Sequence, residues 1–161
     1  MNQVVIVDNI RTGLAKAHRG TFNLTRADAL IAHCIDSLLA RNPALDGAEV
    51  DDVVVGAARQ VGEQAANVAR YGVALSKLPI SVSAATISRA CSSGLNAISI
   101  AATQIMSGCA EVAMAGGVES ITGLERGTPA KFDEHSRLVA EQPAIFMAFA
   151  SVVALTSSPQ A

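Results

Sequence analysis

Short apolar runs alternate with stretches of helical periodicity along the first 117 residues of the chain. The apolar runs are bounded by polar or glycine-containing segments, as buried strands are, and cover residues 3–8, 51–57, 80–87 and 110–117. Apolar residues recur at helical spacing in the segments between them, over residues 26–41, 64–76 and 94–105. Alternating strands and helices predict an α/β layer fold with a mostly parallel sheet covered by helices.

The segment at residues 94–105, GLNAISIAATQI, carries small and apolar residues on nearly every side. A helix with that composition is usually buried all round. The predicted elements are too few to enclose it. We therefore expect one flank of this helix to lack a cover, which leaves apolar surface exposed and favours self-association.

The last forty residues show no further strand–helix unit. Residues 123–142 are polar and contain Pro and Gly, and an apolar stretch, AIFMAFASVVAL, then precedes the closing TSSPQA. We expect two parts: an incomplete α/β domain over residues 1–122, and a partial loop region with a divergent or truncated tail over residues 123–161.

Composition narrows the functional classes. Half of the 161 residues are apolar, 16% are charged, and the mean hydropathy is +0.37, which argues against a disordered chain. A net charge of −2 without a Lys/Arg run disfavours nucleic acid or an anionic membrane as partner. No apolar stretch is long enough to span a bilayer, and the first residues lack a secretory pattern, so we expect a cytoplasmic location.

The three cysteines, Cys34, Cys91 and Cys109, are odd in number and show neither CxxC nor Cys/His ligand spacing. They do not predict a disulfide framework, a zinc site or a bound cofactor. Cys34 falls on the apolar face of a predicted helix and Cys109 at a helix end. We interpret both as small buried apolar residues.

Cys91 differs because it falls between a predicted strand and the first turn of a predicted helix. Unpaired backbone N–H groups and the positive end of the helix dipole stabilise a thiolate there, and can donate to an oxyanion on a thioester carbonyl. The small residues Ser92, Ser93 and Gly94 leave room for an extended acyl chain. From the residues alone, a nucleophile and a small buried residue remain equal alternatives for Cys91.

A resemblance to a known family decides between them. The segment Cys-Ser-Ser-Gly-Leu-Asn-Ala at 91–97 resembles the nucleophile segment of thiolases, and Gly-Gly-Val-Glu-Ser at 116–120 resembles their glycine-pair motif. Further similar stretches run almost without a gap from about residue 3 to residue 122, at residues 8–12, 18–20, 51–56 and 67–70. The chain thus resembles the amino-terminal half of a thiolase.

The resemblance implies an acyltransferase that carries an acyl group on Cys91. Such enzymes cleave 3-ketoacyl-CoA or condense two acyl-CoA molecules, with coenzyme A thioesters as substrates and no other cofactor. They have two similar α/β halves and form dimers or tetramers, so we expect a homo-oligomer or association with a complete thiolase. Four further residues match motif positions and are expected to shape the site by local hydrogen bonds: Asn67, Arg70, Arg89 and Glu119.

The chain also departs from the family pattern. Ser88 stands where many members carry Asn or Asp. The carboxyl half of thiolases, which supplies a base histidine, a second cysteine and an oxyanion asparagine, has no counterpart here. We expect His18, His33 and His135 to be surface or helix-face residues and not partners of Cys91.

Two alternatives to a thiolase-type acyltransferase remain open. The first is a non-catalytic fragment, or an interaction subunit that pairs with a complete thiolase. The second is a ketoacyl synthase, whose nucleophile also lies in a Cys-Ser-Ser context. The residues at 116–120 and the early Arg11-Thr12 pair fit thiolases better.

Overall fold

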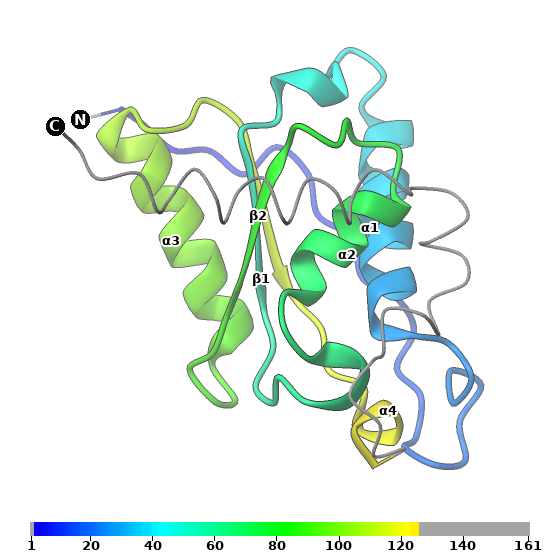
Figure 1. Cartoon of the computed structure of the whole chain (residues 1–161). Coiled ribbons are helices and arrows are strands. Elements are labelled where there is room, and N and C mark those ends of the chain that lie inside the picture. The colour runs from blue at the N-terminus through cyan, green and yellow to red at the C-terminus, as the bar shows by residue number, and fades with distance from the viewer. Residues whose placement is uncertain (1, 126–161) are drawn as a thin grey trace, which may run out of the picture.

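The computed structural model describes residues 2–125, which form a parallel sheet flanked by helices (Figure 1). The strands are β1 (Asp52–Gly56), β2 (Ser83–Ile87) and β3 (Ala113–Gly117), in the order β2-β1-β3. In the register of the sheet, Gly56 lies opposite Ile87 on one side and Gly117 on the other. The predicted α/β class with a parallel sheet is confirmed, and all three strands end at the same edge.

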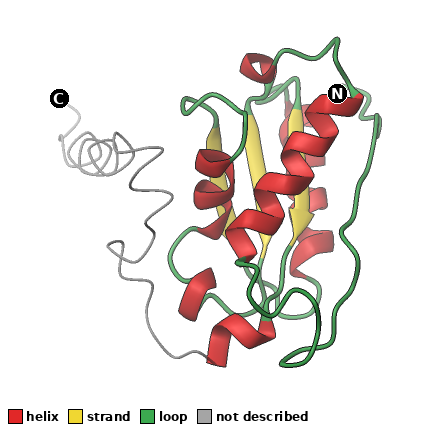
Figure 2. Cartoon of the chain, turned by 90° about the vertical axis from the view of Figure 1, so that its right-hand side faces the viewer, coloured by secondary structure: helices red, strands yellow, loops and turns green. Residues whose placement is uncertain are grey.

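The helices lie on both faces of the sheet (Figure 2). They are α1 (Ala27–Arg41), α2 (Val68–Leu75), α3 (Ser93–Ser107) and α4 (Ile121–Glu125), with single 3₁₀ turns at Gly47–Glu49 and Gly62–Gln64. The crossover β1-α2-β2 runs outward from the central strand, whereas β2-α3-β3 runs back across it. Crossover connections between parallel strands are almost always right-handed. Two such connections that run in opposite directions across a sheet therefore place their helices on opposite faces of it. This explains why α2 and α3 sandwich the sheet.

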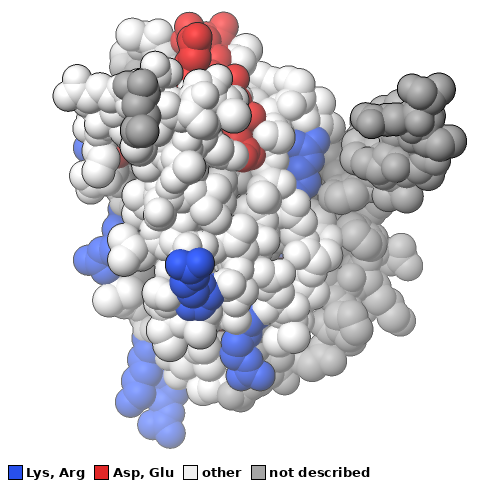
Figure 3. All heavy atoms as spheres, turned by 90° about the vertical axis from the view of Figure 1, so that its left-hand side faces the viewer, with Lys and Arg blue, Asp and Glu red and all other residues white. Residues whose placement is uncertain are grey.

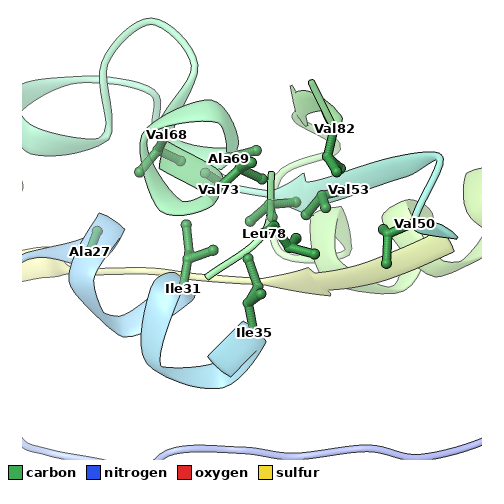
Figure 4. Packing of buried hydrophobic residues seen from close by; sticks show 12 residues of the cluster. Ala27, Ile31, Ile35, Val50, Val53, Val68, Ala69, Val73, Leu78 and Val82 are labelled. Atoms are coloured by element: carbon green, nitrogen blue, oxygen red, sulfur yellow. The ribbon is translucent and has the colours of Figure 1, made fainter. Parts of the chain in front are cut away.

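The main core lies between α1, α2 and the sheet (Figure 4). Val53 and Val55 point into it from β1, while Val54, with the opposite orientation of a strand's alternate residue, is buried on the α3 side. Gly72 allows α1 to approach α2 closely, since a Cβ there would lie 2.7 Å from the Ile31 Cβ. The buried residues of this main core are thus all aliphatic.

The expected strand at residues 3–8 is wrong. This segment has no regular secondary structure and pairs with no described strand, and Val5, Ile6 and Val7 are 67%, 80% and 82% exposed. Its neighbours hold only its ends: the Asn2 N–H donates to the Met106 carbonyl (3.2 Å), and Arg41 donates to Asp8 (2.7 Å). A run of β-branched residues fits a pleated, half-buried surface. It forms a strand only where a neighbouring strand is available to pair with it.

Helix α3 buries one face only. Ser93, Ala97 and Ala101, spaced four residues apart, face the sheet. The opposite, outer face of α3 contains Leu95, Ile98, Ala102 and Met106, of which Leu95 is 72% exposed. The expectation of a helix buried on all sides is therefore wrong for the described chain, and the expected uncovered apolar flank is confirmed.

Figure 3 looks onto the α3 side of the molecule and shows a broad, mostly uncharged surface, with acidic groups near the top and most of the basic groups in the lower half. The sequence of α3 explains this, because it contains no Asp, Glu, Lys or Arg. Within residues 2–125, no helix combines the length and the hydropathy that crossing a bilayer requires.

The outer face of α3 predicts dye binding and self-association. We expect the chain to bind an apolar fluorescent dye and to sediment as concentration-dependent oligomers, because this area is apolar and uncharged. Replacing Leu95 and Ile98 together by Ser should lower both signals several-fold. Thr103→Ser, at another exposed position of α3, is the matched control and should change neither. A soluble monomer without dye binding would contradict the prediction.

Candidate active site

The loops that follow the three strands meet at one edge of the sheet. Backbone bonds continue the ladder past the strands: the Ala57 N–H donates to the Ile87 carbonyl and the Val118 N–H donates to the Gly56 carbonyl, each at 3.0 Å. The Ser88 hydroxyl donates to the Ala58 carbonyl (3.1 Å). The carboxyl edge of a parallel sheet is the usual location of a site in such folds.

Three glycines bring α3 into backbone contact with this edge, and we call their junction the glycine contact: Gly56, Gly94 and Gly117. A Cβ on Gly56 would overlap the Ser93 carbonyl and lie 2.5 Å from the Gly94 nitrogen. A Cβ on Gly117 would lie 3.0 Å from the Gly94 Cα and 3.4 Å from the Gly56 oxygen. The first turn of α3 therefore rests directly on the ends of β1 and β3, with no side chain between them.

Cys91 lies in a tight turn between β2 and α3, residues 89–93, called the Cys91 turn below. The Ser92 N–H donates to the Arg89 carbonyl and the Ser93 N–H to the Ala90 carbonyl, each at 3.1 Å. Cys91 is exposed, and within residues 2–125 its thiol has no hydrogen-bond partner. The position expected from the sequence, between a strand and a helix start, is confirmed.

Unpaired backbone donors lie next to the Cys91 turn. The first regular helical bond of α3 runs from the Asn96 N–H to the Ser92 carbonyl (2.9 Å). The N–H groups of Gly94 and Leu95 come before it and find no acceptor in the described part of the chain. Such groups at a helix start favour an anion. Chemically, this arrangement suits an anionic sulfur or oxygen beside the thiol.

Glu119 connects the loops after β1 and β3. Its carboxylate accepts from the Ala58 N–H and from the Gln64 side-chain amide, each at 2.8 Å. Gln64 is fully buried; its Nε2 also donates to the Arg59 carbonyl, and its Oε1 accepts from the Ser120 N–H. Sequence reasoning missed Gln64, because an isolated Gln in an Ala-rich stretch carries no motif.

Asn67 fixes the start of α2 on β2. Its Oδ1 accepts from the Arg70 N–H (3.1 Å) and from the Thr86 hydroxyl (2.8 Å). Its Nδ2 donates to the Ala84 carbonyl (2.9 Å). All the side-chain polar atoms of Asn67 thus bind neighbouring protein groups, which is the structural role expected for it.

Arg70 holds the segment that leads into β2. Its guanidinium donates to the Val82 and Ile80 carbonyls, each at 2.6 Å, and burial lowers the pKa of this group from its ordinary value. Arg89, in contrast, is exposed, and within residues 2–125 its guanidinium forms no hydrogen bond or ion pair. Arg89 therefore shapes the site only through the hydrogen bonds of its backbone N–H and carbonyl.

Neither described histidine hydrogen-bonds to the Cys91 thiol. His33 lies on α1, across the sheet from α3 (Figure 1), and His18 donates its backbone N–H to the Thr122 hydroxyl (2.9 Å). His135 falls outside the described residues. Within residues 2–125, no group of three or more His, Cys, Asp or Glu side chains could hold a metal ion.

The other two cysteines differ in exposure. Cys34, expected to be buried, is half-buried; this burial raises the pKa of its thiol, an effect partly offset by the Thr12 backbone N–H. The expected burial of Cys109 is wrong, because Cys109 is exposed. Gly108 ends α3 in a left-handed conformation (φ 79°) and the Cys109 N–H returns to the Gln104 carbonyl (2.9 Å), which turns the chain outward.

Cys91 and Cys109 are two exposed thiols at opposite ends of one helix, which provides an internal comparison. We expect iodoacetamide to alkylate Cys91 faster than Cys109, since a helix favours negative charge at its amino end and disfavours it at its carboxyl end. Cys34 should react most slowly because it is half-buried and its pKa is raised. Peptide mass spectrometry at limiting reagent measures all three rates, and faster labelling of Cys109 or Cys34 would refute the order.

Comparisons with known proteins point to one family. The profile of the thiolase N-terminal domain matches residues 4–157. A 3-ketoacyl-CoA thiolase of Escherichia coli O139:H28 is 48% identical over 119 residues, which cover 74% of this chain and 31% of that protein. One of Shigella flexneri serotype 5b is 47% identical over 121 residues, or 75% and 31%. The crystal structure of the Bacillus anthracis acetyl-CoA acetyltransferase aligns with a TM-score of 0.60 and 35% identity, over 65% of this chain and 26% of that one.

Proposed function

The chain belongs to the thiolase family, and we propose that Cys91 accepts the acyl group of an acyl-CoA thioester. One observation carries this proposal: an exposed thiol lies in the turn that enters α3, and the N–H groups of Gly94 and Leu95 in the first turn of that helix have no acceptor within residues 2–125. We further propose that residues 1–122 form an incomplete thiolase amino-terminal domain and residues 123–161 a partial loop region with a divergent or truncated tail; the family profile itself extends to residue 157.

The proposed step is acyl transfer to the Cys91 sulfur. The sulfur attacks the thioester carbonyl of an acyl-CoA, or the C3 keto carbonyl of a 3-ketoacyl-CoA, and forms a new C–S bond as the thiol loses its proton. The attacked carbonyl oxygen becomes an oxyanion that backbone N–H groups can stabilise. With acetyl-CoA, the bond to the coenzyme A sulfur breaks and that thiolate takes up a proton. With a 3-ketoacyl-CoA, the bond between C2 and C3 breaks, and the departing acetyl-CoA carbanion takes up the proton.

Acyl-CoA and coenzyme A are the proposed substrates, and a second copy of the chain or a complete thiolase is the proposed partner. The names of the relatives, 3-ketoacyl-CoA thiolase and acetyl-CoA acetyltransferase, support this substrate class. The chain spans about a third of the length of those thiolases, 31%. The uncharged outer face of α3 supports association.

A second candidate function is that of an interaction subunit without turnover of its own. Its support is the environment of Cys91, which has no hydrogen-bond or ion-pair partner within residues 2–125. These residues therefore place no base at hydrogen-bond distance from the thiol, and a full cycle needs both a base for the incoming nucleophile and an acid for the leaving group.

We predict acylation without efficient turnover. Acetyl-CoA should slowly add one acetyl group at Cys91, seen by intact-mass and peptide mass spectrometry, because a reactive thioester can acylate a thiolate unaided. Steady-state thiolysis of acetoacetyl-CoA should be negligible. Each missing acid–base group typically costs about 10²–10⁴-fold and a missing oxyanion donor about 10²–10³-fold, although such losses are not additive.

Two cysteine variants serve as controls. Cys91→Ala should abolish acetylation, whereas Cys109→Ala, which removes the exposed thiol at the other end of α3, should leave it unchanged. The interaction candidate is tested by measuring the activity of a full-length thiolase with and without this chain added. Robust turnover by the chain alone that Cys91→Ala abolishes would contradict the prediction and point to His18 or His135 as the base.

A further inference from the structure

The residue before Cys91 has an unfavourable backbone conformation. Ala90 has φ 47°, in the left-handed region that residues with a Cβ seldom adopt. Such a conformation persists only where the surroundings hold it in place. Because Ala90 is the second residue of the Cys91 turn, its conformation sets the direction in which the chain enters Cys91.

Ser93 supplies a side chain that holds this turn. Its hydroxyl accepts from the Arg89 N–H at 2.8 Å and donates to the Ala90 carbonyl at 2.6 Å. Ser93 is only 3% exposed, so water has little access to compete for these bonds. One buried hydroxyl thus binds the N–H of the residue before the left-handed residue and the carbonyl of the left-handed residue itself.

The neighbouring serine plays a different part. Ser92 is exposed, and its hydroxyl only donates to the Arg89 carbonyl (2.8 Å). It is the N-cap residue of α3, but its side chain accepts no bond from the helix. Removal of the Ser92 hydroxyl leaves the Arg89 carbonyl with the Ser92 N–H as donor, whereas removal of the Ser93 hydroxyl deprives the Arg89 N–H of its acceptor.

We infer that Ser93 is a positioning residue that keeps Ala90 left-handed and so holds Cys91 at the start of α3. The hydroxyl touches no reacting atom in this role and acts through the backbone of the Cys91 turn. That this positioning assists catalysis rests on the proposed function of Cys91. The geometry of the turn, however, can be tested without any acyl-CoA chemistry.

The experiment measures alkylation of all three cysteines in Ser93→Ala. The ratio of the Cys91 rate to the Cys109 rate should fall about fivefold or more, because two buried hydrogen bonds are lost. Cys34 serves as the reporter of general unfolding and should stay slow. Ser92→Ala, the adjacent matched variant, should lower the ratio less than Ser93→Ala does.

Rescue separates positioning from general stability. In the double variant Ala90→Gly, Ser93→Ala, the ratio should recover most of the loss, because glycine adopts positive φ without a Cβ penalty. An unchanged ratio in Ser93→Ala would overturn the inference. The inference would also be overturned if the ratio falls, Cys34 labelling becomes faster and Ala90→Gly does not restore the ratio. In that case the Ser93 hydroxyl would contribute to the overall stability of the fold.

Acetylation by acetyl-CoA, measured on the same variants, separates this inference from the proposed function. If the unaltered chain is not acetylated but the alkylation ratio still responds to Ser93→Ala and its rescue, the proposed function fails and the positioning role stands. If acetylation at Cys91 occurs and the alkylation ratio ignores Ser93→Ala, the positioning role fails alone.

Discussion

The close approach of the α3 backbone to the ends of β1 and β3 is the constraint on which the site depends. Gly56 and Gly117 lie so near Ser93 and Gly94 that a side chain on Gly56 would overlap the helix backbone. Such backbone-to-backbone contacts are short and stiff. Protein interiors pack at crystal-like density, and no side chain lies between the two backbones that could change its rotamer to make room. The helix start, and the turn that carries Cys91, therefore inherit their position from the sheet.

The polar residues around the site stabilise this framework. Glu119 and the buried Gln64 join the loops after β1 and β3, while Asn67 and Arg70 fix α2 and the approach to β2. Their polar atoms bind protein backbone and one another, whereas the Cys91 thiol is exposed and has no partner within residues 2–125. The exposed Cys91 thiol thus lies in the turn that leads into α3, the helix that also carries the apolar outer face.

Sequence patterns predicted the parts of this arrangement that depend on local order. The strands around Val53–Val55, Ala84 and Met114, the helix after Cys91, and the position of Cys91 between strand and helix all follow from periodicity and motif spacing. The strand expected at residues 3–8 failed because a strand needs a partner, and its apolar residues are exposed instead. The burial expected for Cys109 failed because the left-handed Gly108 turns the chain outward.

The contacts that organise the site are long-range and left no pattern in the sequence. Gln64 meets Ser120 across 56 positions, and Gly56 meets Gly94 through the fold alone. In the sequence, Ser93 is one more small residue beside Cys91. In the fold, its hydroxyl forms two hydrogen bonds in the turn that contains the left-handed Ala90. Such roles depend on which backbone groups the fold leaves unpaired, and this is settled only by the three-dimensional arrangement.

A comparison of Gly56→Ala with Gly116→Ala tests the central claim most directly. The two glycines lie on adjacent strands, but a Cβ on Gly116 would meet nothing within 4 Å. We expect Gly56→Ala to lower the free energy of unfolding in urea by about 1–3 kcal/mol or more and to reduce the ratio of Cys91 to Cys109 alkylation. Gly116→Ala should leave the ratio unchanged and raise stability by up to about 1 kcal/mol. If both variants behave alike, the glycine contact does not position Cys91.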